Sequence, residues 1–342
     1  MNVSVVIPNY NYAKTLGACI EAVLAQTHAP AEIVVVDDGS TDGSVEIARS
    51  YACTVVRTAN RGVSAARNLG VARSSGDVVF FVDSDIALRP DAIEHAVRML
   101  ADDPGLGFVC GVYDDEPLID DGVIERYKVL HGHFWRVRGA GPVHAAFFSL
   151  GAIRRSVFDA VGPLDETLRV TEDVEYGART AQVSRLELSP AVVGRHDDDD
   201  RLSVLLRKQF QRSVPLVALF AERGRGRPRL GETAYRPVAA AGVALAVVCL
   251  PLVWWSAALG VAGVAGLAAF AVVERRLFGF AHRRRGARFL PVFVGLHPLM
   301  SLTTAAAAGV GVCRWLVSGR FRRLYANSGT PAVVAPGGAS GE

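Results

Sequence analysis

Two aspartates stand at the point where an apolar run ends. Asp83 and Asp85 follow the run 78–82 and precede Pro90 in the stretch FFVDSDIALRP. Aspartate and serine are common at strand ends because their side chains bond to nearby backbone N–H groups, so a simple turn is one interpretation. The other interpretation is a metal site, because Mg²⁺ in proteins is usually held by one or two carboxylates together with substrate phosphates.

The elements around these aspartates alternate between apolar runs and segments of helical spacing. Strands are expected in VSVVIP (3–8), in EIVVVDDGSTDGS (32–44) before its polar loop, in CTVVRT (53–58) and in DVVFFVDSD (77–85). Helices are expected at 13–26, 45–51, 62–74 and about 90–101. Strands that alternate with helices predict an α/β fold, with a mostly parallel sheet and helices on both faces.

A polar cluster follows each of these strands, at 9–11, 37–42, 60–64 and 83–85. Parallel sheets bind ligands beyond the carboxyl ends of their strands, so we expect the four clusters to form one pocket. The chain has neither GxGxxG after its first strand nor GxxxxGKS, the usual phosphate-binding loops. A nucleotide in this pocket would therefore need a metal and basic side chains to hold its phosphates.

Several motifs occur together in a familiar order. They are SVVIPNYN, VVVDDGSTD, NRGVSAARNLG, VDSD, GAIRRSVFDAVGPLDE and TEDVEYGAR. In this order they resemble the motifs of the family 2 glycosyltransferases, which have the GT-A fold. The resemblance covers roughly residues 3–180. It implies transfer of a sugar from a nucleotide-sugar donor with inversion of the anomeric centre. It also implies a divalent cation, Mg²⁺ or Mn²⁺, as the cofactor.

The resemblance assigns donor-binding roles to one set of side chains. Asp38 would accept a hydrogen bond from the nucleotide base, Arg67 would contact base or phosphate, and Asp83 would meet the ribose. The full donor-binding set is Pro8, Tyr10, Asn11, Asp38, Arg67 and Asp83. Two alternatives stay open: Asp38 as a turn or helix-capping residue, and Arg67 as a solvated helix residue.

The resemblance also supplies the metal site and the catalytic base. Asp85 would ligate the metal that bridges the two donor phosphates, and His196 stands roughly where some GT-A enzymes have a further metal ligand. Asp173 would be the catalytic base, with Glu172 beside it. A carboxylate suits that role because an acceptor hydroxyl is a poor nucleophile until a base removes its proton. The alternatives are a helix cap for the TED carboxylates and a solvated loop for His196, which precedes the aspartates 197–200.

The charge is divided between two parts of the chain. Residues 1–200 carry a net charge of −12 and residues 201–330 a net charge of +16, within a total of +3. Basic segments that flank apolar spans favour the cytoplasmic face of a membrane. We expect no nucleic-acid partner, because no nucleic-acid-binding motif is present. The five cysteines form no CxxC pair, so neither a zinc site nor a disulfide framework is indicated.

The last third of the chain contains three apolar stretches. Residues 238–273 carry no charge, and we interpret 238–256 and 257–273 as a tight transmembrane hairpin. The third stretch, 289–317, could cross the membrane, re-enter it or lie at its interface. Before them, 202–220 has an amphipathic pattern that fits a helix on a membrane surface or an ordinary packed helix.

One motif in that amphipathic segment bears on the site. QFQRS matches the Q-x-x-R part of a motif of membrane-bound members, so Gln209 and Arg212 are expected to face the acceptor or diphosphate side. Ser213 stands where that motif usually has Trp, which counts against a processive polysaccharide synthase.

The whole chain is expected to have four parts. They are a GT-A domain (1–200), a basic interfacial linker (201–236), a transmembrane helical region (237–318) and a basic, then disordered tail (319–342). We expect a multi-pass protein of the cell (inner) membrane, with a cytoplasmic catalytic domain and a lipid-linked or amphiphilic hydroxyl acceptor. The alternatives are a polyprenyl-phosphate glycosyltransferase and an inactive nucleotide-sugar-binding membrane protein.

Overall fold

The computed structural model describes residues 1–168, 172–222 and 236–324 of the 342. The expected disordered tail at 326–342 lies outside the described residues, as does most of the arginine-rich segment 221–236.

The N-terminal hundred residues form the predicted alternation of strands and helices. The elements are β1 (Val3–Asn9), α1 (Leu16–Leu24), β2 (Glu32–Asp37), α2 (Ser44–Arg49), β3 (Thr54–Arg57), α3 (Val63–Ala72), β4 (Val78–Val82), β5 (Ile86–Leu88) and α4 (Ala92–Asp102). All four predicted strands and all four predicted helices are confirmed. The short strand β5, directly after Asp85, was not predicted.

The next hundred residues complete the sheet and add three helices. The elements are β6 (Leu106–Tyr113), α5 (Val123–Arg138), β7 (Gly141–Val143), β8 (Leu150–Arg154), α6 (Arg155–Val161), α7 (Glu172–Thr180) and β9 (Arg185–His196). The strand order is β3-β2-β1-β4-β8-β6-β9-β5, with β7 paired to β9.

The sheet has a parallel half and a mixed half. β3, β2, β1 and β4 are parallel neighbours, as are β6 and β9. β8 runs antiparallel to both β4 and β6, and β9 pairs antiparallel with β5 and β7. The expectation of a mostly parallel sheet therefore holds for the N-terminal half, whereas the second half is mixed.

Both faces of the sheet are buried, which explains why its central strands are continuously apolar. Along β1, Val5 and Ile7 pack in one core cluster with α1 and α4. Val6, between them, packs in a second cluster with residues of α3, α6 and α7. Successive side chains of a strand point to opposite faces, so one run of apolar residues supplies both layers.

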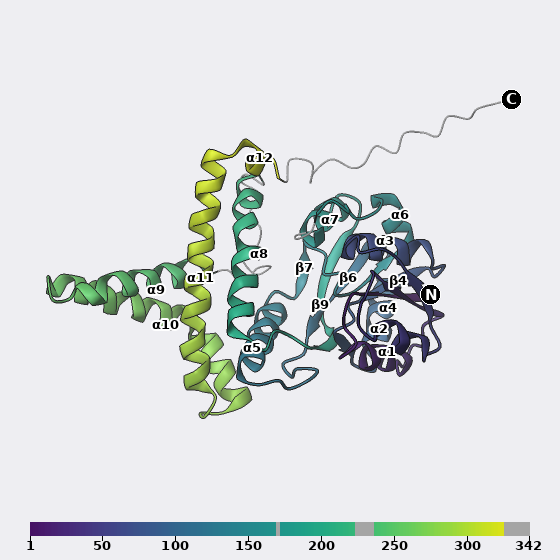
Figure 1. Cartoon of the computed structure of the whole chain (residues 1–342), viewed down its shortest axis with the longest axis horizontal. Helices are drawn as coiled ribbons and strands as arrows, with labels where there is room; N and C mark the ends of the chain where they lie inside the picture. The colour runs from purple at the N-terminus through teal and green to yellow at the C-terminus, as the bar shows by residue number, and fades with distance from the viewer. Residues whose placement is uncertain (169–171, 223–235, 325–342) are drawn as a thin grey trace.

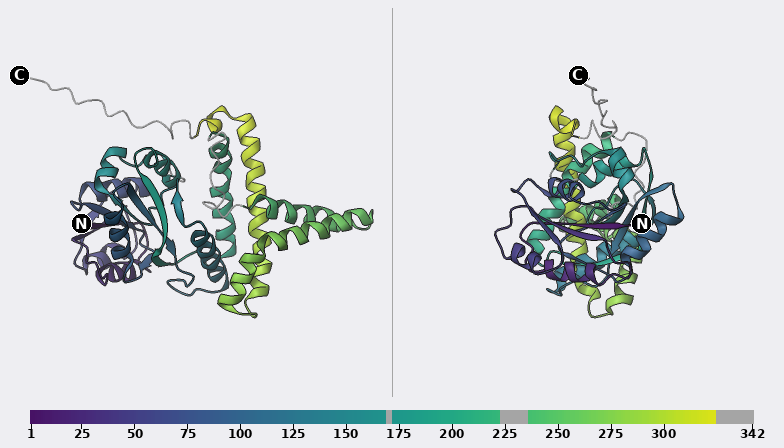
Figure 2. Two further views of the ribbon diagram at one scale, coloured as in Figure 1. Left: turned by 180° about the vertical axis from the view of Figure 1, so that it is seen from behind. Right: turned by 90° about the vertical axis from the view of Figure 1, so that its right-hand side faces the viewer.

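The C-terminal part of the chain is helical. It contains α8 (Leu202–Glu222), α9 (Pro237–Cys249), the 3₁₀ turn η1 (Leu250–Leu252), α10 (Ala257–Arg285), α11 (Leu290–Val317) and α12 (Gly319–Arg322). α9 and α10 form a helical hairpin at the predicted place, and it projects away from the sheet domain (Figure 1), although α9, with 13 residues, is shorter than the predicted span 238–256. α11 is one continuous helix that packs along α8, and both run across the base of the hairpin, as Figure 2 also shows. α10 and α11 are each long and apolar enough to cross a membrane.

α5 connects the sheet domain to these helices. Tyr127, Leu130 and Phe134 on α5 belong to a buried cluster that includes Leu277 of α10 and Phe293 of α11. The Tyr127 hydroxyl also lies 2.8 Å from Nδ1 of His297 on α11. The helices α10 and α11, called the membrane-like helices below, are therefore packed directly against the domain that carries the strand-end aspartates.

A glycine on α3 allows that helix to lie close to the sheet. A Cβ at Gly70 would lie 2.3 Å from Cγ1 of Val6, a buried β1 residue. We expect Gly70→Ala to lower the free energy of unfolding by about 1–3 kcal/mol, the usual cost of overpacking a core. The control is Gly132→Ala on α5, where a Cβ meets nothing within 4 Å. Alanine in that helix interior should instead stabilise by about 0.5–1 kcal/mol. Thermal unfolding in neutral detergent measures both, and equal effects would contradict the close-packing argument.

Candidate functional site

The polar strand ends do meet at one edge of the sheet. A cavity of about 310 Å³, the strand-end cavity, is lined by residues from four of these ends: Pro8, Asn9, Tyr10, Tyr12, Asp38, Asn60, Gly62, Val63, Ala66, Asp83, Ser84 and Asp85. Two neighbouring cavities share Asp83 with it. One, the α7 cavity of about 460 Å³, contains Arg67, Glu172 and Asp173. The other, the aspartate cavity of about 440 Å³, contains Asp85 and His196.

Asp38 is held by the loop in front of α3. Its two carboxylate oxygens accept the backbone N–H groups of Arg61, at 2.9 Å, and Gly62, at 2.7 Å. Asp38 is buried but lines the strand-end cavity. This geometry matches the alternative in which Asp38 is a turn or helix-capping residue. Each carboxylate oxygen keeps a further lone pair that a nucleotide base could use.

Asn11 does not line any of these three cavities. Its backbone has a positive φ of 60°, and its side-chain oxygen accepts the backbone N–H of Thr41 at 2.8 Å. Asn11 therefore shapes the loop beside Pro8 and Tyr10, which do line the strand-end cavity.

Arg67 bridges two of the predicted site carboxylates. Its guanidinium donates to Asp83 Oδ1 at 2.9 Å through Nη2 and to Glu172 Oε1 at 3.1 Å through Nη1. Arg67 is 3% exposed, so the alternative of a solvated helix residue is wrong. Burial raises the pKa of Asp83, while the Arg67 charge opposes that rise. The bridge fixes β4, α3 and α7 relative to one another.

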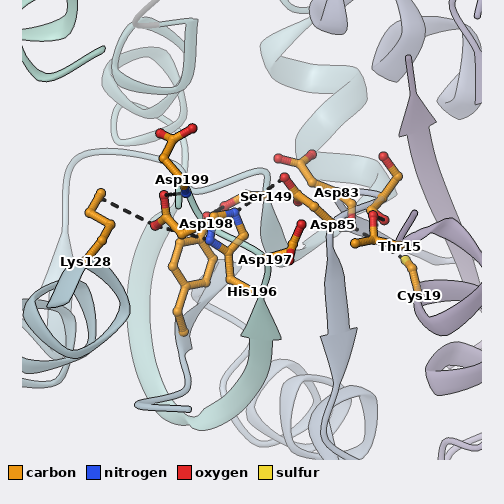
Figure 3. Close-up of polar contacts among 12 residues, drawn as sticks. Thr15, Cys19, Asp83, Asp85, Lys128, Ser149, His196, Asp197, Asp198 and Asp199 are labelled. Atoms are coloured by element: carbon orange, nitrogen blue, oxygen red, sulfur yellow. Dashed lines mark hydrogen bonds and ion pairs between the residues drawn. The ribbon is translucent and has the colours of Figure 1, made fainter. Parts of the chain in front are cut away.

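Asp85 and His196 form a pair with a free carboxylate oxygen (Figure 3). His196 Nε2 lies 3.5 Å from Asp85 Oδ2, while the buried Oδ1 of Asp85 has no hydrogen-bond partner among the described residues. His196 ends β9, is largely buried and stacks on the ring of Tyr113 at 4.5 Å. The solvated-loop alternative for His196 is therefore wrong.

A divalent cation fits this pair only with help from the donor. An unpaired buried carboxylate oxygen beside an imidazole offers two ligands, and the described residues contain no group of three or more that could hold a metal. Few protein ligands are common for Mg²⁺, because it is usually held by one or two carboxylates and takes waters and substrate phosphates as its remaining ligands.

Three of the four aspartates after His196 have a basic neighbour. Asp197 pairs with Lys14 at 3.1 Å, and Asp199 pairs with Lys208 at 2.7 Å. Asp198 lies 3.3 Å from His196 Nδ1 and 3.7 Å from Lys128 (Figure 3). This segment is a charge-paired wall of the aspartate cavity rather than a free acidic loop.

Asp173 lies near the start of α7 and lines the α7 cavity. Burial, followed by the charge of neighbouring Glu172, raises the pKa of Asp173 to about 6. Its Oδ1 accepts the backbone N–H of Val174 at 2.8 Å, which is a capping contact. A carboxyl group with a pKa near 6 is a stronger base than an ordinary aspartate and is still ionised at neutral pH.

Two side chains at the junction of the cavities were not predicted. Tyr113, at the end of β6, and Arg136, on α5, line both the α7 and the aspartate cavities. The Arg136 guanidinium lies 3.9 Å above the Tyr113 ring, which also stacks on His196. Neither residue belongs to a recognisable motif. The one available signal is that Tyr113 follows the apolar run 106–112, as a strand-end residue would.

The two residues of the QxxR motif contact different parts of the structure. Arg212 lines the α7 and aspartate cavities, as predicted for a residue facing the site. Gln209 turns to α11, where its amide donates to the Thr304 hydroxyl at 3.0 Å. α8 therefore presents one side chain to the site and the other to the membrane-like helices.

The fold is also found in a solved structure. The mannosyltransferase PcManGT from Pyrobaculum calidifontis, in complex with GDP-Man and Mn²⁺, aligns over 93% of this chain and 88% of its own, with a TM-score of 0.57 and 22% identity. This likeness confirms the expected GT-A fold.

The sequence comparisons agree. The glycosyltransferase AglE of Haloferax volcanii is 30% identical over 218 residues, which are 61% of this chain and 71% of that protein. The glycosyltransferase alr2836 of Nostoc sp. is 41% identical over 105 residues, 29% of this chain and 33% of that protein. The chain spans a third or less of the length of this and two further curated relatives. The family model described as glycosyl transferase family 2 matches residues 4–162, and the chain belongs to that family.

Proposed function

We propose that this chain transfers a sugar, with inversion, from a nucleotide-sugar donor to a hydroxyl group of a lipid-linked or amphiphilic acceptor. One observation carries the proposal: Asp173, with its raised pKa, shares the α7 cavity with Asp83, which also lines the strand-end cavity. A base for the acceptor and a carboxylate suited to the donor therefore face connected spaces.

In this proposal the strand-end cavity holds the nucleoside of the donor. Pro8, Tyr10 and Asp38 line the base side, and Asp83 takes the ribose. Arg67 acts indirectly, because its guanidinium is already engaged by Asp83 and Glu172. It holds both carboxylates in position, which corrects the expectation of a simple contact with base or phosphate.

The metal is part of the same proposal. Asp85 and His196 would hold Mg²⁺ or Mn²⁺, and PcManGT, which shares the fold, was solved with GDP-Man and Mn²⁺. When bound, such a cation supplies Lewis-acid stabilisation for the leaving diphosphate. Asp173 would accept the proton of the acceptor hydroxyl. Arg136 and Arg212, which line the same cavities, add positive charge near the diphosphate or acceptor side.

The geometry favours a membrane location. Exposed apolar side chains cover the α9–α10 hairpin, and its tip carries Trp254 and Trp255, which are 91% and 81% exposed. A Cβ at Gly242 would lie 2.6 Å from the backbone oxygen of Gly266, so the two helices meet through small residues, as membrane helices often do. Such a surface is stable in lipid rather than in water.

The hairpin also suggests an orientation. At the base end of α10, Arg284 pairs with Asp115 at 2.8 Å and Arg285 with Glu116 at 2.9 Å. The basic end of the hairpin therefore lies on the side of the catalytic domain, as expected for a cytoplasmic domain on the inner membrane. Within this proposal, residues 1–200 act on the donor, 201–236 link, and 237–318 contact the lipid.

Two rivals remain, and each makes a different prediction. In a polyprenyl-phosphate glycosyltransferase the acceptor is already anionic, so Asp173 would not need to remove a proton. In an inactive nucleotide-sugar-binding protein no transfer would occur, although the site keeps both Asp85 and Asp173.

The metal role is tested through Asp85. We expect Asp85→Asn to weaken Mn²⁺ binding at least tenfold in the presence of a nucleoside diphosphate, because the neutral amide is a much weaker ligand than the carboxylate. Electron paramagnetic resonance measures the bound Mn²⁺, and EDTA should abolish transfer. Asp102→Asn, at the exposed end of α4, is the control and should change neither. Full activity in EDTA would rule out the metal role.

The catalytic base is tested by its pH dependence. Because its pKa is raised to about 6, Asp173 is protonated below that pH and unable to act as a base. We expect kcat to fall about tenfold per pH unit below 6 and to level off above it. Asp173→Asn should lower kcat by about 10²-fold or more and remove this dependence, with donor binding unchanged.

Asp159→Asn, exposed on α6, controls for a general effect of charge. An equal loss of donor affinity in Asp173→Asn would indicate a structural cap. Unchanged turnover would favour the rival with an anionic acceptor.

Insertion of the hairpin tip is tested by fluorescence. In vesicles that contain brominated lipids we expect Trp254 and Trp255 to be quenched by the bromine and protected from acrylamide. Changing both to Phe should remove most of the bromine-quenched signal, since the other two tryptophans, Trp135 and Trp315, lie at less exposed positions on α5 and α11. Quenching by acrylamide in the presence of vesicles would show that the tip stays in water.

A further inference from the structure

A separate cavity lies between α5 and the C-terminal helices. This cavity, the helix cavity, has a volume of about 220 Å³ and is bounded by residues of α5, α8 and α11 and by the start of α9. Three cations line it, Lys128, Arg136 and Arg236. No aspartate or glutamate is among the described residues that line it. It shares Lys128 and Arg136 with the aspartate cavity, but the proposed function places no ligand in the helix cavity itself.

The cations of the helix cavity are incompletely neutralised. Lys128 and Arg236 have carboxylate neighbours, Asp198 and the buried Glu274, but each at 3.7 Å, beyond hydrogen-bond distance. Arg136 has no ion pair among the described residues, and its buried Nη1 has no hydrogen-bond partner there. A buried charged donor without an acceptor is costly, so the site favours a ligand that supplies anionic oxygens.

Arg136 is nevertheless held firmly in place. Its guanidinium lies 3.9 Å from the ring centre of Tyr113 and 4.8 Å from that of Phe147. The two rings fix the guanidinium without using its hydrogen-bonding capacity. Gln209 and Thr304 add neutral hydrogen-bonding groups to the same cavity.

The helix cavity lies between the hairpin and the proposed base. Arg136 and Phe147 also line the α7 cavity, which contains Asp173. Arg236 and Ala240, which also line the helix cavity, belong to the start of the hairpin. An amphiphile whose tail lay along the hairpin would therefore place its head group in this cavity, next to the catalytic site.

We infer that the helix cavity binds the phosphate head group of an amphiphile. The inference rests on the proposed function for its position in the reaction, and it narrows the acceptor side to a phosphate-bearing lipid environment. Two sources share this chemistry: a phosphate carried by the acceptor itself, and the head group of a bulk anionic phospholipid. Phosphate fits because guanidinium groups bind its oxygens through short, charge-assisted hydrogen bonds.

Gly132 offers a test that leaves all three cations in place. Gly132 lines the helix cavity from α5, and a Cβ there would meet nothing within 4 Å. Gly132→Glu introduces a negative charge beside the cations, while Gly132→Gln introduces a side chain of nearly the same size without the charge. Both changes replace glycine inside a helix, so neither is expected to impair folding.

The probe is dodecyl phosphate, with dodecanol as its phosphate-free counterpart, added to the full-length protein in dodecyl maltoside. We expect calorimetry to show binding of dodecyl phosphate at least tenfold tighter than that of dodecanol. Gly132→Glu should weaken it at least tenfold, and Gly132→Gln by less than threefold. Nucleoside diphosphate binding, measured in parallel, should be unchanged in both variants. Equal effects of Glu and Gln, or equal binding of phosphate and alcohol, would overturn the inference.

The source of the phosphate is then separated by competition. If dodecyl phosphate raises the KM for the acceptor in a lipid extract without changing kcat, the cavity belongs to the acceptor. If phosphatidylglycerol displaces the probe and dodecyl phosphate leaves that KM unchanged, the cavity holds a bulk head group. Loss of nucleoside diphosphate binding in the unaltered protein would count against the proposed function, and it would leave the dodecyl phosphate result intact.

Discussion

The buried guanidinium of Arg67 is the interaction on which the site depends. It ties Asp83, at the end of β4, to Glu172, at the start of α7, and its own helix α3 lies between them. The side chains of Asp83 and Glu172 are only 28% and 15% exposed, so without this charge their loss of solvation would favour the protonated carboxyl groups. Breaking such a network by removing one partner is typically worth about 3–5 kcal/mol, so it is a strong constraint on local geometry.

A second set of contacts connects the site to the C-terminal helices through α5. The rings of His196 and Tyr113 and the guanidinium of Arg136 stack in one column, which passes from β9 across β6 to α5. Asp85 lies at one end of this column, and the buried face of α5 that contacts α10 and α11 lies beyond the other end. A shift of α5 against the membrane-like helices would therefore move Arg136 relative to both Asp85 and Asp173.

The sequence predicted the elements whose residues face a buried environment on both sides. β1 to β4 were recognisable because both faces of these strands pack against helices, which makes the strands continuously apolar. The strand-end polar clusters followed from the same alternation, and with them the positions of Asp38, Asp83 and Asp85. The second half of the sheet was not predicted in detail, because β8 pairs with β4 and β6 through contacts distant in sequence.

The orientation of individual side chains could not be predicted from the sequence, for a related reason. Nothing in AARN indicates that Arg67 turns inward to Asp83 and Glu172, since those partners lie 16 and 105 residues away. The third apolar stretch was left open because a single crossing would place the basic residues after it on the outer side, against the usual distribution of positive charge. In the structure α11 continues through Pro298, supported by its packing along α8.

The contacts between the sheet domain and the C-terminal helices suggest a role for the uneven distribution of charge along the chain. A domain of net charge −12 is repelled by an anionic membrane surface, whereas the C-terminal part, at +16 over 201–330, is attracted to it. The two parts are joined by ion pairs such as Arg284 with Asp115, so the attraction acts on the domain through a rigid connection. On the proposed function, this division of charge separates the route of the donor from the route of the acceptor. A water-soluble donor reaches the strand-end cavity on the acidic side, and an amphiphilic acceptor arrives through the helices on the basic side. Asp173 lies where these two routes meet, because the α7 cavity shares Asp83 with the first and Arg136 with the second.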